Sequence, residues 1–313
     1  MTRAFVFPGQ GSQAVGMGRE LAEAFEVARL TFEEVDDALN QRLSRLMFEG
    51  PDADLTLTEN AQPALMAVSV AVMRVLKDQG GLDLAKHAAF VAGHSLGEYS
   101  ALCAAGAFSL ADTARLLKLR GQAMQKAVPV GKGAMAALLG AELEQAQSIA
   151  TDAAQGDVCT VANDNSSGQV VISGHAEAID RAIMLAAERG LKRSVRLPVS
   201  APFHCPLMQP AADAMAEALA NVTINPPVVP VVANVTASAV SDPNVIRRLL
   251  VDQVTGMVRW RESVLFMKEQ GVDTLVELGS GKVLSGLAKR IDKELAGTSV
   301  QGPADVESFL KTL

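Results

Sequence analysis

The chain has 313 residues, of which 49% are hydrophobic and 20% charged, so it can bury a large core and does not resemble a disordered protein. Its formal net charge of −7 argues against a general attraction to nucleic acid. Its three cysteines, Cys103, Cys159 and Cys205, form no C-x-x-C pair, which argues against a disulfide framework or a cysteine zinc site and favours a reducing cytoplasm.

The first part of the chain is predicted to begin with a strand over 4–7 that ends at Pro8-Gly9. This apolar run is too short for a signal peptide, and no run of about 18 apolar residues predicts a membrane span. A second strand is expected over 88–92. Helices are predicted over 15–25, over 27–47, from Pro63 to about Lys77, and over 110–126 behind a Ser109 cap.

The middle of the chain has a pattern of its own. Its elements follow the order strand, helix, strand, strand, helix, strand, which is the ferredoxin-like βαββαβ pattern. They are predicted over 133–140, 142–153, 158–162, 169–173, 176–188 and 191–197. We therefore expect a small domain, 128–197, inserted into a larger α/β domain made of 1–127 and 198–313.

An α/β pattern resumes after Pro198. Helices are predicted over 206–221, 243–253 and from about 283, and strands over 228–234 and 274–278. The whole chain is thus expected to be α/β, with a large domain interrupted once.

The segment 93–97, Gly-His-Ser-Leu-Gly, matches the G-x-S-x-G pattern of a nucleophile elbow. In such a turn the hydroxyl of Ser95 is exposed at the edge of the sheet, and the flanking glycines relieve crowding. The N–H of Leu96 would then point at a developing oxyanion. An ordinary glycine-flanked turn is the alternative, but the predicted strand before and helix after favour a nucleophile.

A serine nucleophile requires a base, and the chain offers four histidines. His94 adjoins Ser95 and should point away from its hydroxyl, His87 lies in the polar approach to the strand, and His175 opens a helix of the small domain. His204 lies where the large domain resumes and is the candidate base. A histidine satisfied in a loop or core remains the alternative.

Two glycine-rich segments suggest nucleotide binding, but their surroundings argue against it. Segment 9–14 fits G-x-G-x-x-G/A, yet the region 26–46 after it is charged and helical in period instead of a second strand. Segment 279–282 is no P-loop, because Val276 and Val283 occupy the positions of its glycine and its Ser or Thr. We interpret the first segment as a loop whose backbone N–H groups supply a second oxyanion donor.

Arg120 lies late in a predicted helix, beside Gly121. An acyl group with a free carboxylate needs a bidentate cationic partner, and arginine suits that role. A solvated surface arginine is the alternative, because Arg115 and Lys118 are close by in the sequence.

Taken together, these segments resemble the malonyl-CoA:acyl carrier protein transacylase family. The matches span nearly the whole chain in the family's order, so the set is specific although each motif is short. They are Phe-Pro-Gly-Gln-Gly-Ser-Gln at 7–13, Gly-His-Ser-Leu-Gly-Glu-Tyr at 93–99, Arg-Gly-Gln-Ala-Met-Gln at 120–125, and segments 163–174, 200–208 and 277–284. The resemblance implies an α/β-hydrolase-like large domain with a parallel sheet and a ferredoxin-like small domain.

The resemblance also implies roles for the candidate residues. Ser95 is the nucleophile and His204 its base, while the backbone N–H groups of Gln10 and Leu96 form the oxyanion hole. Arg120 binds the malonyl carboxylate.

Two further roles rest on the resemblance. Gln253 orients the histidine through its backbone carbonyl, in place of the aspartate of a triad. Phe203 beside the histidine is like the malonyl-selective relatives, in which bulk there disfavours an α-methyl group. Ser280 departs from the family, which commonly has proline at this position.

The implied activity is transfer of malonyl from malonyl-CoA to the phosphopantetheine thiol of acyl carrier protein, for fatty acid or polyketide elongation. The family uses a ping-pong cycle through malonyl-Ser95, with a CoA thioester as substrate and no metal or other cofactor. We expect a cytoplasmic monomer with no nucleic-acid or membrane partner. An acidic carrier protein would need a local basic patch on this chain. The candidates are Lys192, Arg193, Lys282, Lys289 and Arg290, and the alternative is that these side chains are simply solvated.

Two other functions remain possible on the sequence. A serine hydrolase would share the elbow and His204 but would release the acyl group to water, and a neutral acyl chain would leave Arg120 without a partner. A carrier-protein-binding subunit without activity is the alternative that is not an enzyme.

Overall fold

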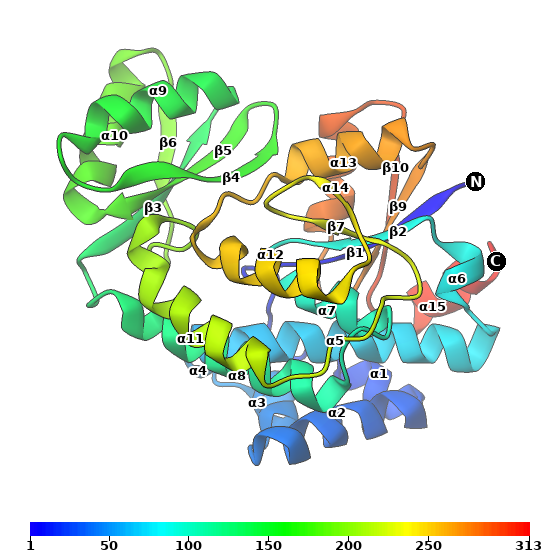
Figure 1. The fold of residues 1–313 in the computed structure, drawn as a ribbon. Coiled ribbons are helices and arrows are strands. Elements are labelled where there is room, and N and C mark those ends of the chain that lie inside the picture. Colours follow the sequence, from blue (N-terminus) through cyan, green and yellow to red (C-terminus); the bar gives the residue numbers. More distant parts are fainter.

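Six strands form the larger of the two sheets in the computed structural model, which describes residues 1–313 (Figure 1). Neighbouring strands run parallel except at one edge, where β7 and β8 are antiparallel. The spatial order is β10 (Ala296–Val300), β9 (Thr274–Leu278), β1 (Arg3–Phe7), β2 (Phe90–Gly93), β7 (Val231–Ala233) and β8 (Ser238–Val240). The predicted α/β class with a parallel sheet is confirmed.

Strand β1 shows why this sheet is covered on both faces. All five of its residues are buried, as expected for a central parallel strand. Alternate side chains point to opposite faces of a strand, and here Phe5 and Phe7 join a core of 59 buried residues while Ala4 and Val6 join a separate core of 14.

Helices from the N-terminal half pack on the first of these faces, and the long buried helix α5 runs beneath the sheet (Figure 1). They are α1 (Arg19–Ala24), α2 (Glu26–Leu39), α3 (Leu43–Glu49), α4 (Asp52–Thr56), α5 (Thr58–Gly80), α6 (Leu84–His87), α7 (Leu96–Ala104) and α8 (Leu110–Ala127). The Ser109 side chain caps α8 as predicted, accepting the N–H of Asp112 at 3.0 Å.

Two helix predictions in this region are wrong. The helix expected over 27–47 breaks at Asn40, which adopts a left-handed conformation with φ 47° and separates α2 from α3. Pro63 does not open its helix. Helix α5 begins at Thr58, where the carbonyl of Leu57 accepts the first N–H groups, and burial of the helix offsets the one hydrogen bond that the proline lacks.

The second sheet lies beside the first and is antiparallel throughout (Figure 1). Its strand order, β4-β5-β3-β6, is that of the predicted ferredoxin-like pattern, and 17 buried residues form its own core. The elements are β3 (Gly133–Leu139), α9 (Leu143–Ala154), β4 (Cys159–Ser166), β5 (Gln169–His175), α10 (Ala176–Glu188) and β6 (Arg193–Arg196). The boundaries at 128 and 197 stay a prediction.

Strand β4 connects the small sheet to the rest of the chain. It runs to Ser166, beyond its expected end at 162, because its second half continues to pair with β5, and this half also bridges to Val258 of the large domain. Val258 donates its N–H to Ala162 at 2.8 Å and accepts the N–H of Asp164 at 3.0 Å. The buried carboxylate of Asp164 also pairs with Arg261 at 2.9 Å, so the two sheets hold a defined relative position.

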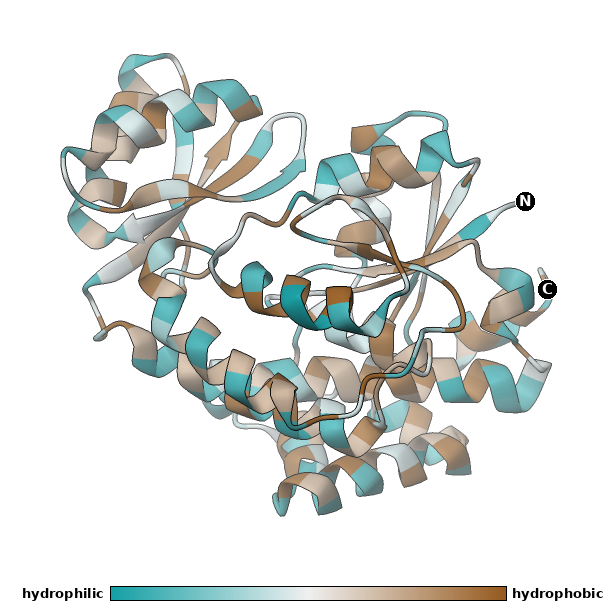
Figure 2. Ribbon diagram, viewed as in Figure 1, coloured by the Kyte–Doolittle hydropathy of each residue, from teal (hydrophilic) through white to brown (hydrophobic).

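The C-terminal part adds helices to both faces of the large sheet. Its helices are η1 (Pro206–Met208), α11 (Gln209–Ala220), α12 (Pro243–Thr255), α13 (Trp260–Glu269), α14 (Val283–Ile291) and α15 (Pro303–Leu310). Helices α13 and α14 pack in the core of 14 residues on the second face, and the others join the core of 59 on the first. Helix α12 alternates hydrophilic and hydrophobic residues along its length, as an amphipathic surface helix does (Figure 2). None of the helices combines the length and apolarity needed to cross a membrane.

Candidate active site

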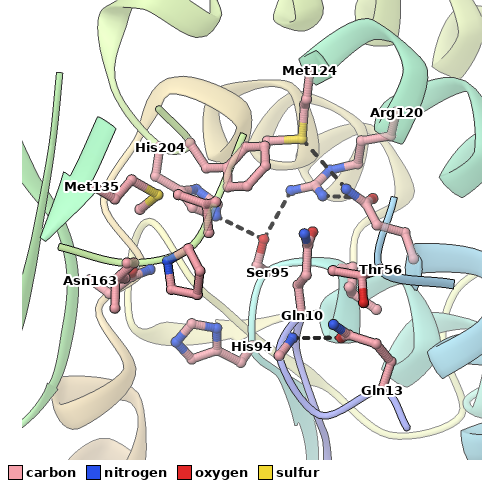
Figure 3. A pocket seen from close by; sticks show the side chains of 17 residues that line it. Gln10, Gln13, Thr56, His94, Ser95, Arg120, Met124, Met135, Asn163 and His204 are labelled. Carbon is pink, nitrogen blue, oxygen red and sulfur yellow. Dashed lines mark hydrogen bonds between the residues drawn. The ribbon is translucent and has the colours of Figure 1, made fainter. Parts of the chain in front are cut away.

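A pocket of about 410 Å³ opens at the C-terminal ends of β1 and β2, between the two sheets. Both sheets contribute to its walls, since Met135 and Asn163 belong to the small one. Figure 3 shows Ser95 at the centre, with His204 and Arg120 on either side of its hydroxyl. The predicted residues Gln10, Ser95, Leu96, Arg120, Phe203 and His204 all line this pocket.

Ser95 lies on a sharp turn between β2 and α7. Its φ of 55° and ψ of −111° are unusual for a residue with a side chain, and such strain is typical of a nucleophile elbow. The flanking glycines are required by space. A Cβ on Gly93 would lie 1.9 Å from the carbonyl carbon of Gly97, and a Cβ on Gly97 would lie 2.2 Å from the carbonyl oxygen of Phe7.

His204 faces the serine in the geometry of a general base. Its Nε2 lies 2.7 Å from Ser95 Oγ, although the two residues are 109 positions apart. Its Nδ1 lies 2.9 Å from the backbone carbonyl of Gln253 and 3.2 Å from that of Gly256. Carbonyl oxygens only accept, so Nδ1 carries the proton and Nε2 is free to accept the serine proton. The structure therefore brings the backbone carbonyl of Gln253 into contact with the His204 ring.

Arg120 is 1% exposed, so the alternative of a solvated surface arginine is wrong. Its Nη2 donates to Ser95 Oγ at 3.1 Å and to Gln253 Oε1 at 2.8 Å, and its Nη1 donates to Gln62 Oε1 at 2.8 Å. These partners are two neutral amides and a hydroxyl. The buried positive charge thus faces the nucleophile without a carboxylate hydrogen-bonded to it, and an anionic group of a ligand would fit there.

Two backbone donors point to an oxyanion site. The N–H groups of Gln10 and Leu96 have no acceptor within the chain, while both residues line the pocket. Gln10 follows β1 and Leu96 follows β2, and these strands are parallel neighbours. Leu96 is also the first residue of α7, where the helix dipole favours negative charge.

A buried polar network behind the elbow escaped the sequence interpretation. Asn234 Oδ1 accepts the N–H of Ser95 at 2.8 Å, and its Nδ2 donates to the carbonyl of Gly93 at 2.7 Å. Glu98 Oε2 accepts the N–H of Asn234 at 3.0 Å and Gln253 Nε2 at 2.9 Å. Two residues could have been noticed in the sequence as candidates for buried polar contacts. Asn234 is a polar residue at the end of an apolar strand, and Gln62, which binds Arg120, is a polar residue within a buried helix.

The structure also places His94 and Phe203. His94 turns away from Ser95 (Figure 3). Its Nε2 lies 2.8 Å from Asn165 Oδ1 of strand β4. Phe203 is 8% exposed and lines the pocket directly before His204. No group of three or more His, Cys, Asp or Glu side chains is arranged to hold a metal ion.

Burial keeps His204 in its neutral form. Loss of solvent, and then the positive charge of Arg120, lower the pKa of His204 to about 3. A lowered pKa means that the proton leaves at lower pH than usual, so Nε2 is free to act as a base throughout the neutral range.

The rate of Ser95 acylation is accordingly expected to stay nearly constant from pH 8 down to about pH 5 and to fall only as the pH approaches the pKa of His204. Single-turnover acylation followed across pH is the measurement. Because burial raises the pKa of Glu98 to about 7, the profile is also recorded with Glu98→Gln, which removes that titration. Half-loss near pH 6.5 in both proteins would contradict the assignment.

These groups together support acyl transfer. They comprise a serine hydroxyl, a neutral imidazole in contact with it, two unpaired N–H donors and a buried guanidinium. The first three are the components of covalent catalysis on a carbonyl, and the fourth favours an acyl group that carries a negative charge.

Comparison with known proteins agrees with this chemistry. The family model described as acyl transferase domain matches residues 4–299. The malonyl CoA-acyl carrier protein transacylase of Bacillus subtilis is 44% identical over 99% of this chain and 96% of its own. An acyl-carrier-protein S-malonyltransferase from Bartonella henselae is 57% identical, with a TM-score of 0.97 over 100% and 99% of the two chains. A malonyl-transacylase solved with a type II PKS acyl-carrier protein is 44% identical, with a TM-score of 0.96 over the full length of both chains.

Proposed function

This chain belongs to the malonyl-CoA:acyl carrier protein transacylase family, and from this we propose that it transfers malonyl from malonyl-CoA to the phosphopantetheine thiol of an acyl carrier protein. The observation that carries the proposal is the buried guanidinium of Arg120, 3.1 Å from Ser95 Oγ and without a carboxylate among its hydrogen-bond partners. The names of the relatives support the same substrates.

In the first half-reaction Ser95 Oγ attacks the thioester carbonyl of malonyl-CoA while His204 Nε2 takes the hydroxyl proton. The negative charge that forms on the carbonyl oxygen would be stabilised by the N–H groups of Gln10 and Leu96. Collapse of the tetrahedral intermediate breaks the carbon–sulfur bond, and His204 returns its proton to the departing CoA thiolate. The product is an ester of malonate with Ser95.

The second half-reaction reverses this sequence with a different thiol. The phosphopantetheine thiol enters the same pocket, gives its proton to His204 Nε2 and attacks the ester carbonyl. The carbon–oxygen bond then breaks, and His204 protonates Ser95 Oγ, so the enzyme returns to its starting state. The cycle draws only on groups of this chain and on the two thioester-forming thiols, and we propose that no metal or other cofactor takes part.

Arg120 would select the acyl group. Its Nη2 donates to Ser95 Oγ in the free enzyme, and we propose that the malonyl carboxylate replaces that hydroxyl as its acceptor. The exchange frees Ser95 for attack and satisfies the buried charge. Phe203 narrows the pocket beside His204 and would disfavour a branched acyl group.

The carrier protein would dock through exposed basic side chains. Lys192, Arg193, Lys282, Lys289 and Arg290 are all exposed, and none is paired with an acidic side chain. We propose that part of this set receives the acidic carrier, in which case added salt slows the second half-reaction more than the first.

Intact-mass analysis tests the proposed function in two steps. Incubation with malonyl-CoA alone is expected to add one malonyl group, and later addition of holo acyl carrier protein is expected to remove it and to yield malonyl-carrier. Steady release of free malonate before the carrier is added would instead indicate a hydrolase. Absence of any adduct, with no transfer to the carrier, would indicate a binding subunit without activity.

A further inference from the structure

Glu98 is a buried acid that the proposed cycle does not use. It lies on α7, three residues after Ser95, with 2% of its surface exposed. It forms no salt bridge, and its hydrogen bonds are received from a backbone N–H and a neutral amide. A carboxyl group buried in this way is costly unless its partners compensate, so its location requires an explanation.

The partners of Glu98 are the residues that hold the reacting groups. Asn234, whose N–H it accepts, binds both the N–H of Ser95 and the carbonyl of Gly93. Gln253, whose Nε2 it accepts, contacts the carbonyl of Ser95 at 3.0 Å and supplies the carbonyl that orients His204. Glu98 thus contacts both residues that hold Ser95 and His204 in place, Asn234 and Gln253.

The Gln253 amide links Glu98 to Arg120. Its Nε2 faces acceptors only, namely Glu98 Oε2 at 2.9 Å, the Ser95 carbonyl and, at 3.4 Å, Asn234 Oδ1. Its Oε1 faces a donor, Arg120 Nη2, at 2.8 Å. Rotating the amide by 180° would set oxygen against oxygen on one side and N–H against N–H on the other. The acceptor on Glu98 therefore favours the orientation that presents Oε1 to the guanidinium.

We infer that Glu98 is a positioning residue for acyl-group selection, which through the Gln253 amide holds Arg120 in the orientation that receives the acyl carboxylate. The inference rests on the proposed function of Arg120. Burial raises the pKa of Glu98 to about 7, but a proton on Oε1 leaves Oε2 an acceptor, so the support persists in either charge state. The orientation of the Gln253 amide thus depends on the hydrogen bond that Glu98 accepts and not on the charge of Glu98.

Three variants separate positioning from general support of the fold. Glu98→Met keeps the length of the side chain and removes the acceptor, whereas Glu98→Gln keeps an acceptor and removes the charge. Ser100→Ala is the matched control, because Ser100 is buried on the same helix and its hydroxyl has no hydrogen-bond partner. Each protein is titrated with malonyl-CoA and with acetyl-CoA, and kcat/KM for acylation is measured by intact mass.

We expect Glu98→Met to lower the malonyl-to-acetyl ratio of kcat/KM by about 10- to 100-fold, mainly through a higher KM for malonyl-CoA, because a displaced guanidinium binds the carboxylate poorly. Glu98→Gln and Ser100→Ala should keep the ratio within about threefold of wild type. Equal proportional losses with both thioesters, or a loss in Glu98→Gln as large as in Glu98→Met, would overturn the inference.

Failure to fold would not leave the question open. If Glu98→Met is not recovered folded, Glu98→Asp decides, because it keeps the carboxyl and withdraws it by one methylene. Its malonyl-to-acetyl ratio should fall, and an unchanged ratio would overturn the inference. A wild-type enzyme that is not acylated by malonyl-CoA would instead refute the proposed function itself.

Discussion

Ser95→Ala is expected to abolish acylation by malonyl-CoA and to lower transfer to the carrier protein by about 10⁴- to 10⁶-fold. The Ser95 hydroxyl lies 2.7 Å from Nε2 of His204, on a strained turn that is followed directly by Leu96 with its unpaired N–H. Removing Oγ leaves His204 with nothing to deprotonate in the first half-reaction. Intact mass after incubation with malonyl-CoA is the measurement, and the mass should stay that of the free protein.

The control for this variant is Ser100→Ala, five residues further along. Its hydroxyl is buried but makes no hydrogen bond, so its loss should leave the malonyl adduct intact. A malonyl increment on Ser95→Ala equal to that of wild type would show that another residue is the nucleophile.

Arg120→Ala is expected to lower kcat/KM for malonyl-CoA by about 10²- to 10³-fold, because the acyl carboxylate loses its charged partner inside a buried pocket. Acetyl-CoA has no carboxylate to lose, so its acylation rate should fall far less and the selectivity should narrow. Parallel titrations with the two thioesters give both values. Arg120→Lys should recover only part of the malonyl activity, since a single ammonium cannot make the bidentate contact.

Loss of activity in Arg120→Ala could also arise from damage to the fold, and the same measurements distinguish the two causes. The guanidinium satisfies the amides of Gln62 and Gln253, so its loss also leaves two buried acceptors without a donor. A thermal melt measures the stability that is lost when these acceptors are left unpaired. Equal proportional losses with malonyl-CoA and acetyl-CoA would assign Arg120 to the fold alone.

Local sequence patterns were enough to predict the elbow and the inserted domain. Gly93 and Gly97 flank the serine because neither position has room for a Cβ, and a constraint of that kind appears directly in the sequence. The strands and helices of the small domain follow regular periods over 133–197, and their order specifies the ferredoxin-like arrangement. The contact between Ser95 and His204 was reached by elimination among only four histidines.

Long-range polar contacts could not be predicted in this way. Gln253 is hydrogen-bonded to Ser95, 158 positions away in the sequence, and to Glu98, 155 positions away. Contacts at such separations leave no periodic pattern in the sequence. Glu98 was visible within the family motif, but only the folded chain shows that it joins Asn234 to Gln253. The Pro63 prediction was wrong for a related reason, because tertiary burial of α5 outweighed the local preference of proline for a helix start.

The two unpaired N–H groups have a consequence for how such a site is found by mutagenesis. They belong to the backbone of Gln10 and Leu96, which follow the adjacent parallel strands β1 and β2. Every substitution at these positions except proline retains the N–H. An alanine scan of the pocket would therefore miss the contribution of these N–H groups, which is typically about 10²- to 10³-fold in rate for a donor of this kind. Leu96→Ala would report only the loss of a buried side chain. Backbone ester substitution is the change that would reveal them.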